Sequence, residues 1–476
     1  MKGYLYWSAY NNVCETPHMD AAPGRIMNGD ATSCGNALAM ASRDGRATPE
    51  LFVVAARQFL ASADARTCAV TCDDYAEYDL GFETRRHGDF LYVTRTCGDE
   101  RLAPGMRIAA VGRNAVPFLL QDTGAEIFWG RDTDREDWDL ALRMYDDIDV
   151  FPGDGHVERL PLRRFPKVGA PKSANGTGGS GPKGSGAEGT TDACADAREV
   201  APGVALLEVR SLADAVALGR TLVGAAELLE HCGRLVLDVR RCSGEADPAS
   251  YLALLPYLTD EPRAARDVFP DVPVYTIYSR RNAERLLAPL DATRTRLEAA
   301  GDNASLRLLD EVAADVRAKA AQVLAAKREL RTLPERRAAS ELPEVVPSPF
   351  GDELVEPTPV VADAAGRSHG APRRVAMLVD STTGVGAERL AQACMGWENV
   401  RLVGRATPGA VDYANYVTAD YPDVRARLTY PISRTAASRD GHGFARTGLP
   451  LDAHVPFTPE ECTSDVMLAR AVGALG

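Results

Sequence analysis

The clearest pattern of apolar and polar positions lies in the C-terminal part of the chain. Val375–Val379 is a continuous apolar run of the length expected for a fully buried strand. Ser381–Gly386 is a turn of small residues, and a helix is predicted from Glu388 through Cys394. A strand, a turn and a helix in this order expose a turn side chain beside the first unpaired N–H groups of the helix. This is a suitable place for acyl-transfer chemistry.

Apolar periodicity predicts further elements before this segment. Leu51–Leu60 indicates a helix, and Phe90–Arg95 alternates as a strand does. Val204–Val209 predicts a strand that is followed by an amphipathic helix over Leu212–His231. Arg280–Arg337 predicts a long, charged helical segment, which we expect to pack as a hairpin on the core or on a second subunit.

Shifts in composition divide the chain into four parts. In order, they are a mainly helical segment, a β-rich domain, a Gly- and Ser-rich flexible linker and an α/β core, covering residues 1–75, 76–166, 167–199 and 200–476. The core includes the helical insertion at 280–337. It also includes a Pro-rich, acidic connector at 343–372, part of which we expect to be disordered.

Composition narrows the classes of partner. The 476 residues carry a formal net charge of −13 with a pI near 5.2, which argues against nucleic acid or an anionic membrane as the main partner. No apolar stretch approaches the ~20 residues of a membrane-spanning helix. The ten cysteines lack the spacing of a zinc site, so we expect buried, reduced thiols and neither a metal nor another cofactor.

The N-terminal sequence MKGYLYWSAYNN has neither the apolar core nor the small-residue cleavage site of a signal peptide. We therefore expect a cytoplasmic protein, or an exported one if a leader has been removed. The long helical insertion is compatible with assembly of the chain into a homo-oligomer.

The segment from Asp380 to Glu388, DSTTGVGAE, resembles the nucleophile segment of the S41 serine peptidases, the C-terminal-processing or tail-specific proteases. The family pattern is D-x-x-T-x-S-small-small-E. The sequence fits this frame at every position but one, because Val385 stands where the catalytic serine belongs. The resemblance implies the family's crotonase- and ClpP-like α/β core, here with an isopropyl group at the nucleophile position.

Further segments of the predicted core carry the same resemblance. Arg234–Glu245 is similar to the family's L-D-x-R-x-N-x-G-G strand and loop, and Val400–Ala410 is similar to its G-x-x-T-x-G-K strand and turn. Ala410 occupies the position of the family's general-base lysine. Arg446–Asp452 and Pro456–Leu468 resemble the G-I-x-P-D segment and the closing helix of the family.

Tricorn-like members of this family use a histidine as the base, and this alternative is missing as well. Arg66 occupies the position of that histidine, in the turn after the N-terminal helix, and Ala445 occupies the position of its supporting glutamate. Arginine stays protonated and cannot accept the proton of a serine. By resemblance, the nucleophile and both kinds of base are therefore absent, at Val385, Ala410, Arg66 and Ala445.

Other groups near these positions have a catalytic and a structural interpretation. Gly386 could direct its N–H at an oxyanion together with the backbone of Gly244, or it could be a simple turn glycine. Ser381 or Thr383 could replace the nucleophile, with His442 as a relocated base. Hydroxyls in such turns more often cap a helix, and a lone loop histidine is usually solvated.

The charged residues of the Arg234–Glu245 segment have mainly structural interpretations. Asp238 and Arg240 are expected to pair and to brace the end of the strand. Glu245 could place a new carboxylate in the old cleft, but a surface carboxylate is the simpler interpretation.

The β-rich part resembles a PDZ domain. Asp79–Phe82 is similar to the G-L-G-F carboxylate loop, and Leu102–Val116 is similar to the stretch L-x-x-G-D-x-I-x-x-V-x-G. PDZ domains bind chain ends by strand addition, with backbone N–H groups holding the terminal carboxylate. Asp79 is expected to weaken such binding through its negative charge. The resemblance implies peptide binding by Leu80, Gly81 and Phe82.

Two functions remain. The first is a pseudopeptidase that binds peptides or protein C-termini without cleaving them. The second is an active serine-type peptidase in which Ser381 or Thr383 works with His442. The second requires a base within hydrogen-bond reach of the hydroxyl, and since the sequence indicates no such pair, we predict the first.

Overall fold

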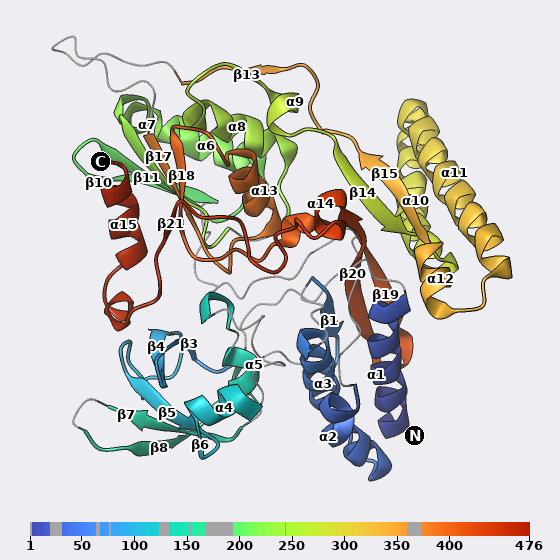
Figure 1. The fold of residues 1–476 in the computed structure, drawn as a ribbon, viewed down its shortest axis with the longest axis horizontal. Coiled ribbons are helices and arrows are strands. Elements are labelled where there is room, and N and C mark those ends of the chain that lie inside the picture. The colour runs from blue at the N-terminus through green and yellow to red at the C-terminus, as the bar shows by residue number, and fades with distance from the viewer. Residues whose placement is uncertain are drawn as a thin grey trace.

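The computed structural model describes residues 2–19, 31–62, 67–75, 78–122, 133–136, 138–143, 145–152, 155–166, 194–242, 244–358 and 374–476. The described residues form three N-terminal helices, a β-rich domain, an α/β core and a helical hairpin. The hairpin lies at the right of the view in Figure 1 and the β-rich domain at the lower left. The fold is mixed α/β, as the sequence predicts.

A six-stranded sheet forms the centre of the core. Its strand order is β10-β11-β12-β17-β18-β21, with β10 antiparallel to β11 and the other pairs parallel. The strands are β10 (Ala195–Ala201), β11 (Val204–Val209), β12 (Arg234–Asp238), β17 (Arg374–Val379), β18 (Val400–Gly404) and β21 (Ala453–His454). The core sheet thus begins inside residues 167–199, which we predicted to be linker.

Alternate residues of these strands point to opposite faces of the sheet, and helices cover both faces. One face packs against α6, α7, α8 and α13, and the other packs against α15. The helices are α6 (Ala215–Gly224), α7 (Ala226–His231), α8 (Pro248–Leu258), α13 (Val385–Ala393) and α15 (Val466–Ala474). The single helix predicted over Leu212–His231 is therefore two helices that meet at Ala225.

The second sheet of the core carries the N-terminal helices. Its strand order is β1-β20-β14-β15, and β19 also pairs with β20. Tyr10, Phe52 and Tyr430 are fully buried where the helices meet this sheet. The elements are α1 (Lys2–Met19), α2 (Ala31–Arg43), α3 (Pro49–Ser62), β1 (Ala69–Cys72), β14 (Val272–Ile277), β15 (Glu341–Val346), β19 (Tyr413–Tyr421) and β20 (Ala426–Thr435).

Two predictions about this sheet need correction. Residues 1–75 are mainly helical as predicted, but β1 at their end is a strand of the core sheet, paired with β20. The predicted connector at 343–372 begins inside β15, which pairs with β14 in a regular antiparallel ladder. Residues 359–373 lie outside the described residues.

The predicted insertion is a helical hairpin, as expected. α10 (Arg280–Ala300) ends at Gly301, whose φ of 69° forms a left-handed cap, and Asp302 caps the start of α11 (Asn303–Ala326). Val316 and Val323 of α11 pack toward the core beside Tyr278. The short elements η3 (Lys327–Glu329) and α12 (Leu333–Ala338) lead back to β15.

The β-rich domain has a hydrophobic core of its own, which includes Leu91, Ile108 and Val150. Its main sheet has the order β3-β4-β5-β7-β8, β6 pairs with β5, and β2 pairs with β9. Its elements are β2 (Tyr78–Asp79), β3 (Phe82–His87), β4 (Phe90–Thr96), β5 (Arg107–Val111), β6 (Asn114–Ala115), α4 (Val116–Asp122), η2 (Thr133–Arg135), α5 (Trp138–Leu142), β7 (Asp147–Phe151), β8 (Glu158–Pro161) and β9 (Phe165–Pro166).

Short elements complete the core and connect its two sheets. They are β13 (Arg263–Ala264), α9 (Ala265–Val268), β16 (Leu354–Val355), η4 (Ala410–Asp412), η5 (Pro422–Val424), α14 (Ala436–Arg439) and η6 (Pro459–Cys462). The loop around η4 matters most for function, because it lies next to α13 at the carboxyl end of the six-stranded sheet.

Candidate functional site

The predicted nucleophile segment forms the expected strand, turn and helix. β17 is fully buried from Val375 to Val379, and α13 begins at Val385, ahead of the predicted start at Glu388. Val385 is half-buried as the first residue of this helix, directly after the N-cap Gly384. An isopropyl group neither attacks a carbonyl nor exchanges a proton, so this position supplies no nucleophile.

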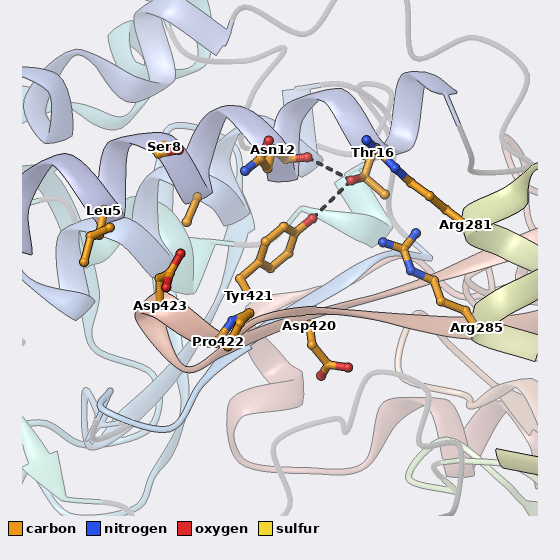
Figure 2. A pocket seen from close by; sticks show the side chains of 11 residues that line it. Leu5, Ser8, Asn12, Thr16, Arg281, Arg285, Asp420, Tyr421, Pro422 and Asp423 are labelled. Atoms are coloured by element: carbon orange, nitrogen blue, oxygen red, sulfur yellow. Dashed lines mark hydrogen bonds between the residues drawn. The ribbon is translucent and has the colours of Figure 1, made fainter. Parts of the chain in front are cut away.

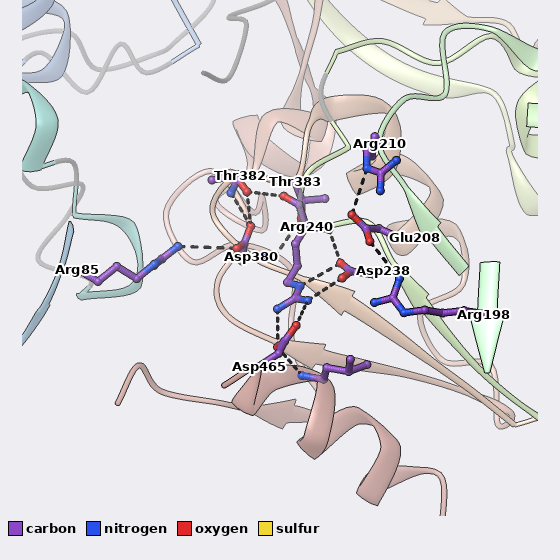
Figure 3. Close-up of polar contacts among 11 residues, drawn as sticks. Arg85, Arg198, Glu208, Arg210, Asp238, Arg240, Asp380, Thr382, Thr383 and Asp465 are labelled. Atoms are coloured by element: carbon purple, nitrogen blue, oxygen red, sulfur yellow. Dashed lines mark hydrogen bonds and ion pairs between the residues drawn. The ribbon is translucent and has the colours of Figure 1, made fainter. Parts of the chain in front are cut away.

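The threonine hydroxyls of the turn stabilise the turn itself. The Asp380 N–H donates to Thr383 Oγ1 at 3.0 Å, and the Thr383 side chain is fully buried. Thr382 Oγ1 donates to Asp380 Oδ1 at 2.7 Å and also contacts the carbonyl of Arg240 (Figure 3). Ser381 is half-buried in the same turn. The threonines therefore have the capping role that is common for hydroxyls in turns.

His442, the candidate for a relocated base, lies in the loop after α14. Its side chain is exposed, and its backbone N–H donates to the Ala437 carbonyl at 2.8 Å. Within the described part of the chain, no hydrogen bond joins its imidazole to Ser381 or Thr383. In this conformation the pair of a hydroxyl and a histidine is not assembled.

Backbone carbonyls occupy the N-terminal end of α13. The Gly386 N–H donates to the Gly244 carbonyl at 3.1 Å, and the Gly384 N–H donates to the Cys242 carbonyl at 2.7 Å. The Gly386 carbonyl is also hydrogen-bonded, because it accepts the hydroxyl of Tyr251 at 2.9 Å. The N–H groups at a helix start are a common anion site, but here the chain's own carbonyls take this place. Gly244 and Gly386 therefore do not form an oxyanion hole in this conformation.

Cys242 occupies the family's asparagine position and could itself have replaced the nucleophile. It is buried, and burial raises the pKa of its thiol to about 12. A thiol becomes a good nucleophile only as a thiolate, so this group is unreactive near neutral pH.

Ala410, at the position of the lysine base, starts η4 directly after Gly409, whose φ is 74°. This loop is fixed to α13 by Glu388, which is fully buried. The Glu388 carboxylate accepts the N–H groups of Gly409 at 2.6 Å and of Val411 at 3.2 Å. Burial raises the pKa of Glu388, and hydrogen bonds from Thr407 and the loop N–H groups oppose this. Glu388 belongs to the motif of the nucleophile segment, but the motif did not predict that its carboxylate would hold the Ala410 loop.

A second buried carboxylate connects the Ala445 segment to the same loop. Asp412 Oδ2 accepts the Ala445 N–H at 2.7 Å, and burial raises the pKa of Asp412. The structure therefore brings the Ala410 loop beside α13 and places Ala445 against that loop. Arg66, the fourth predicted position, lies outside the described residues. The roles of Asp412 and Tyr251 could not be predicted from the sequence, because their partners Ala445 and Gly386 are distant in the chain.

The Asp238 and Arg240 pair is confirmed. Arg240 donates to the Asp238 carboxylate through Nε at 3.0 Å and Nη2 at 2.6 Å, and it also contacts Asp465 of the α15 cap at 2.7 Å (Figure 3). These bonds fix the end of β12, as predicted. Glu245 is exposed, which agrees with its interpretation as a surface carboxylate.

The β-rich domain contacts the core next to this site. Arg85 Nη2 lies 3.7 Å from Asp380 Oδ2, in the turn before α13 (Figure 3). Arg135 Nη1 donates to the Ala445 carbonyl at 3.1 Å, and His454 Nε2 lies 2.7 Å from Asp134 Oδ2. The two domains therefore meet at the loops that would surround a peptidase site.

The predicted carboxylate loop of this domain is already engaged. The Gly81 N–H donates to Asp79 Oδ1 at 2.8 Å, and Gly81 has a φ of 80°. The side chains of Leu80 and Phe82 are buried in the domain core. The Gly81 carbonyl accepts the N–H groups of Cys97 at 2.8 Å and Asp99 at 3.2 Å, so both backbone groups of Gly81 are hydrogen-bonded within the domain.

The structure gives two findings about cofactors and membranes. Across the described ranges, no cluster of three or more His, Cys, Asp or Glu side chains is arranged to hold a metal ion. None of the helices described combines the length and the apolar character needed to cross a membrane.

Comparison with known proteins identifies the fold. No family model and no curated protein sequence matches the chain. The structure of mature CPAF complexed with lactacystin aligns with 100% of this chain and 97% of its own, with a TM-score of 0.54 and 14% identity. A crystal structure of mature CPAF aligns over the same shares with a TM-score of 0.51 and 14% identity.

A third match, the photosystem II D1 C-terminal processing protease, is more distant. It aligns with 97% of this chain and 94% of its own, with a TM-score of 0.35 and 13% identity. At these identities the likeness concerns the fold and not the chemistry. The chain therefore shares the fold of mature CPAF along its whole length.

Proposed function

We propose that this protein is a pseudopeptidase, which binds peptides or protein C-termini on an S41-like scaffold without cleaving them. The observation that carries the proposal is the start of α13, where Val385 stands at the nucleophile position and the Gly386 N–H donates to Gly244. A serine peptidase needs a hydroxyl, a base within reach and donors for the oxyanion. Val385 supplies no hydroxyl and Ala410 supplies no base. The Gly386 N–H, which would serve as the oxyanion donor, is already hydrogen-bonded to the Gly244 carbonyl.

The β-rich domain supplies the binding half of the proposal. Its β3 pairs with β4 on one side, and among the described residues no strand pairs with its other edge. An extended peptide end could add to that edge as it does in PDZ domains. Its terminal carboxylate would take the Gly81 N–H from Asp79. Arg85, on the same strand, would place the bound peptide beside the turn at Asp380.

A fluorophosphonate probe tests the absence of catalysis. We expect no covalent labelling of the purified protein and, by mass spectrometry, no cleavage of a panel of unstructured peptides. Labelling of Ser381 or Thr383 would instead establish the alternative, an active peptidase with relocated groups. An active serine peptidase serves as the positive control for the probe.

Fluorescence polarisation tests the binding half. We expect peptides with a free C-terminus to bind, and the same peptides with an amidated C-terminus to bind at least about tenfold more weakly, because a charge-assisted hydrogen bond is lost. Asp79→Ala should tighten binding, since it frees the Gly81 N–H. Asp89→Ala, an exposed carboxylate on the same domain, should leave the affinity unchanged. Equal binding of free and amidated peptides would contradict the assignment.

A further inference from the structure

The strand β10 lies at one end of the six-stranded core sheet (Figure 1). It pairs with β11 on one side, and no strand of the described residues pairs with its other side. The Arg210 N–H donates to the Cys194 carbonyl at 2.8 Å, which sets the hydrogen-bonding phase of this antiparallel ladder. Because the backbone groups of alternate residues point to opposite sides of a strand, those of Ala195, Ala197 and Glu199 point away from β11. These three residues offer N–H and C=O groups at the edge of the sheet.

The free edge of the second core sheet is interrupted by a proline, whereas the edge at β10 is not. β15 ends that sheet, and the Tyr278 N–H donates to the Ser340 carbonyl at the start of its ladder with β14. The same alternation points the backbone of Pro343 outward, where proline has no N–H for an added strand. Edge prolines protect sheets against pairing with other chains. The middle outward position of β10 is Ala197, whose N–H a second strand can use.

Charges of both signs alternate along one face of this edge. Asp196 and Arg198 are exposed, and Arg198 Nη1 lies 3.3 Å from Asp196 Oδ2 and 3.8 Å from Glu208 Oε2 of β11 (Figure 3). Glu208 Oε1 lies 3.2 Å from Arg210 Nε. Two acidic and two basic side chains therefore share this face. Such a balanced edge does not repel a second copy of itself, although the whole chain is acidic.

We propose that two copies of the chain associate through β10, with the two strands antiparallel and the two-fold axis at Ala197. In this register Ala197 lies opposite Ala197 of the second copy, and Ala195 lies opposite Glu199 of the second copy. All three outward residues then exchange backbone hydrogen bonds. Asp196 lies opposite Arg198 of the second copy, and symmetry repeats this pair on the other side of the axis. The two core sheets become one continuous sheet.

Other two-fold registers match the strand less well. An axis at Asp196 would place two aspartates directly opposite each other, and an axis at Arg198 would do the same with two arginines. Like charges directly opposite each other destabilise a strand pair. An axis between two residues would set outward backbone groups against groups that already point toward β11. The axis at Ala197 satisfies both the backbone and the charges.

A groove beside β10 gives the second strand space on the face covered by helices. The groove has a volume of about 640 Å³ and is lined by β10, α6 and α7, with Ala197, Gly224, Ala225 and Leu228 among its residues. These side chains are small or apolar, so they leave room for the alanine side chains of the second copy. One short strand and this groove form a small interface. We therefore expect a dissociation constant of about 10–100 µM.

Sedimentation velocity of the full chain tests the association. Between about 1 µM and about 300 µM, we expect the sedimentation coefficient to rise from that of a monomer toward that of a dimer. Ala197→Pro removes the outward N–H at the axis and leaves the hydrogen bonds to β11 in place, so it should weaken association at least about tenfold. Far-UV circular dichroism verifies that this variant is folded. A chain that stays monomeric over the whole range would overturn the proposal.

Charge reversal tests the register of the two strands. Asp196→Arg and Arg198→Asp each place like charges across the axis, and each should weaken association at least about tenfold. In an equimolar mixture of the two variants, opposite charges face each other again, and heterodimers should form with an affinity within about threefold of the unmodified protein. A change confined to the stability of one chain would not produce this rescue.

Arg317→Asp, at an exposed arginine of α11, is the matched control for charge reversal. It should leave the dissociation constant unchanged. Two results would contradict the proposed register. One is a mixture of the two β10 variants that associates no better than either variant alone, and the other is a single variant whose affinity stays within about twofold of the unmodified protein.

Discussion

Polar groups at the start of α13 are hydrogen-bonded within the chain, whereas charged groups at the cavity beside α1 are exposed to solvent. At α13, the chain satisfies its own polar groups: the Gly386 N–H meets Gly244, and the Glu388 carboxylate meets the loop at Gly409. At the surface cavity that Ser8, Arg281 and Asp423 help to line, the side chains of Arg281 and Asp423 are exposed to solvent (Figure 2). The first region contains the motif positions Val385 and Ala410, and the second lies outside the motif segments.

The difference indicates what each region can do. A site acts on a ligand through donors, acceptors and charges that are free to meet it, and internal hydrogen bonds use up that capacity. The α13 region therefore contributes stability, and its hydroxyls and N–H groups maintain loops. The charged side chains of Arg281 and Asp423 at the cavity are solvated and contribute little to stability. Removing polar groups should accordingly cost stability at α13 and change it little at the exposed residues of the cavity.

The largest expected effect on stability is that of Glu388→Ala. The substitution leaves the buried N–H groups of Gly409 and Val411 without an acceptor, and each orphaned donor costs about 1–3 kcal/mol. We expect the free energy of unfolding to fall by about 3 kcal/mol or more in urea titrations. The control Glu245→Ala removes an exposed carboxylate and should change it by less than about 0.5 kcal/mol. Equal effects would show that Glu388 does not hold the loop.

A pair of glycine substitutions tests how tightly the same loop is packed. Gly409 and Gly441 both have positive φ, 74° and 87°, so an alanine costs about 1–2 kcal/mol of backbone strain at either position. A Cβ on Gly409 would also lie 2.3 Å from the Phe444 carbonyl oxygen, whereas a Cβ on Gly441 has no neighbour within 4 Å. Gly409→Ala should therefore destabilise the protein by about 2 kcal/mol more than Gly441→Ala. Thermal unfolding of both variants measures the difference, and similar midpoints would contradict the packing.

The pH dependence of stability gives a smaller effect at the same carboxylate. Burial raises the pKa of Glu388 above its ordinary value, so the folded state binds this proton more tightly than the unfolded state does. The resulting stabilisation is present below the ordinary pKa of glutamate and is lost as the pH rises through the raised pKa. Glu388→Gln lacks this titration. We expect the stability of the unmodified protein relative to the variant to decline as the pH rises above the ordinary glutamate pKa of 4.5. A constant difference would contradict the direction of the shift.

Local patterns predicted much of the core. The apolar run Val375–Val379 forms the buried strand that it predicts, and the helix after it begins at Val385, three residues before the predicted start at Glu388. The elements that the sequence did not reveal are short strands with distant partners. β1 pairs with β20, and β15 forms its ladder where proline-rich sequence favoured a connector. Such pairings depend on the assembled sheet and not on local propensity.

The same reasoning explains what was missed at the site. The sequence alone shows that Val385 and Ala410 carry no reactive group, because both side chains are hydrocarbon. Two other features depend on how distant loops pack together. They are the hydrogen bond from the Gly386 N–H to the Gly244 carbonyl and the hydrogen bond from the Gly409 N–H to the Glu388 carboxylate. The cavity between α1 and α10 also depends on tertiary packing, since its walls come from α1, from α10 and from the turn between β19 and β20.

The smallest expected effect is that of restoring the family's side chains at α13, and it tests whether internal hydrogen bonding keeps this region inactive. Val385→Ser combined with Ala410→Lys restores the two side chains that the family uses, but it leaves the Gly386 N–H donating to Gly244. We expect stability to change by no more than about 1 kcal/mol, because Val385 is only half-buried, and we expect no peptide cleavage above the level of Ala410→Lys alone. Mass spectrometry of peptide mixtures measures the cleavage. Turnover by the double variant would mean that the Gly244 contact opens readily, and that the missing side chains alone, and not internal hydrogen bonding, make this site inactive.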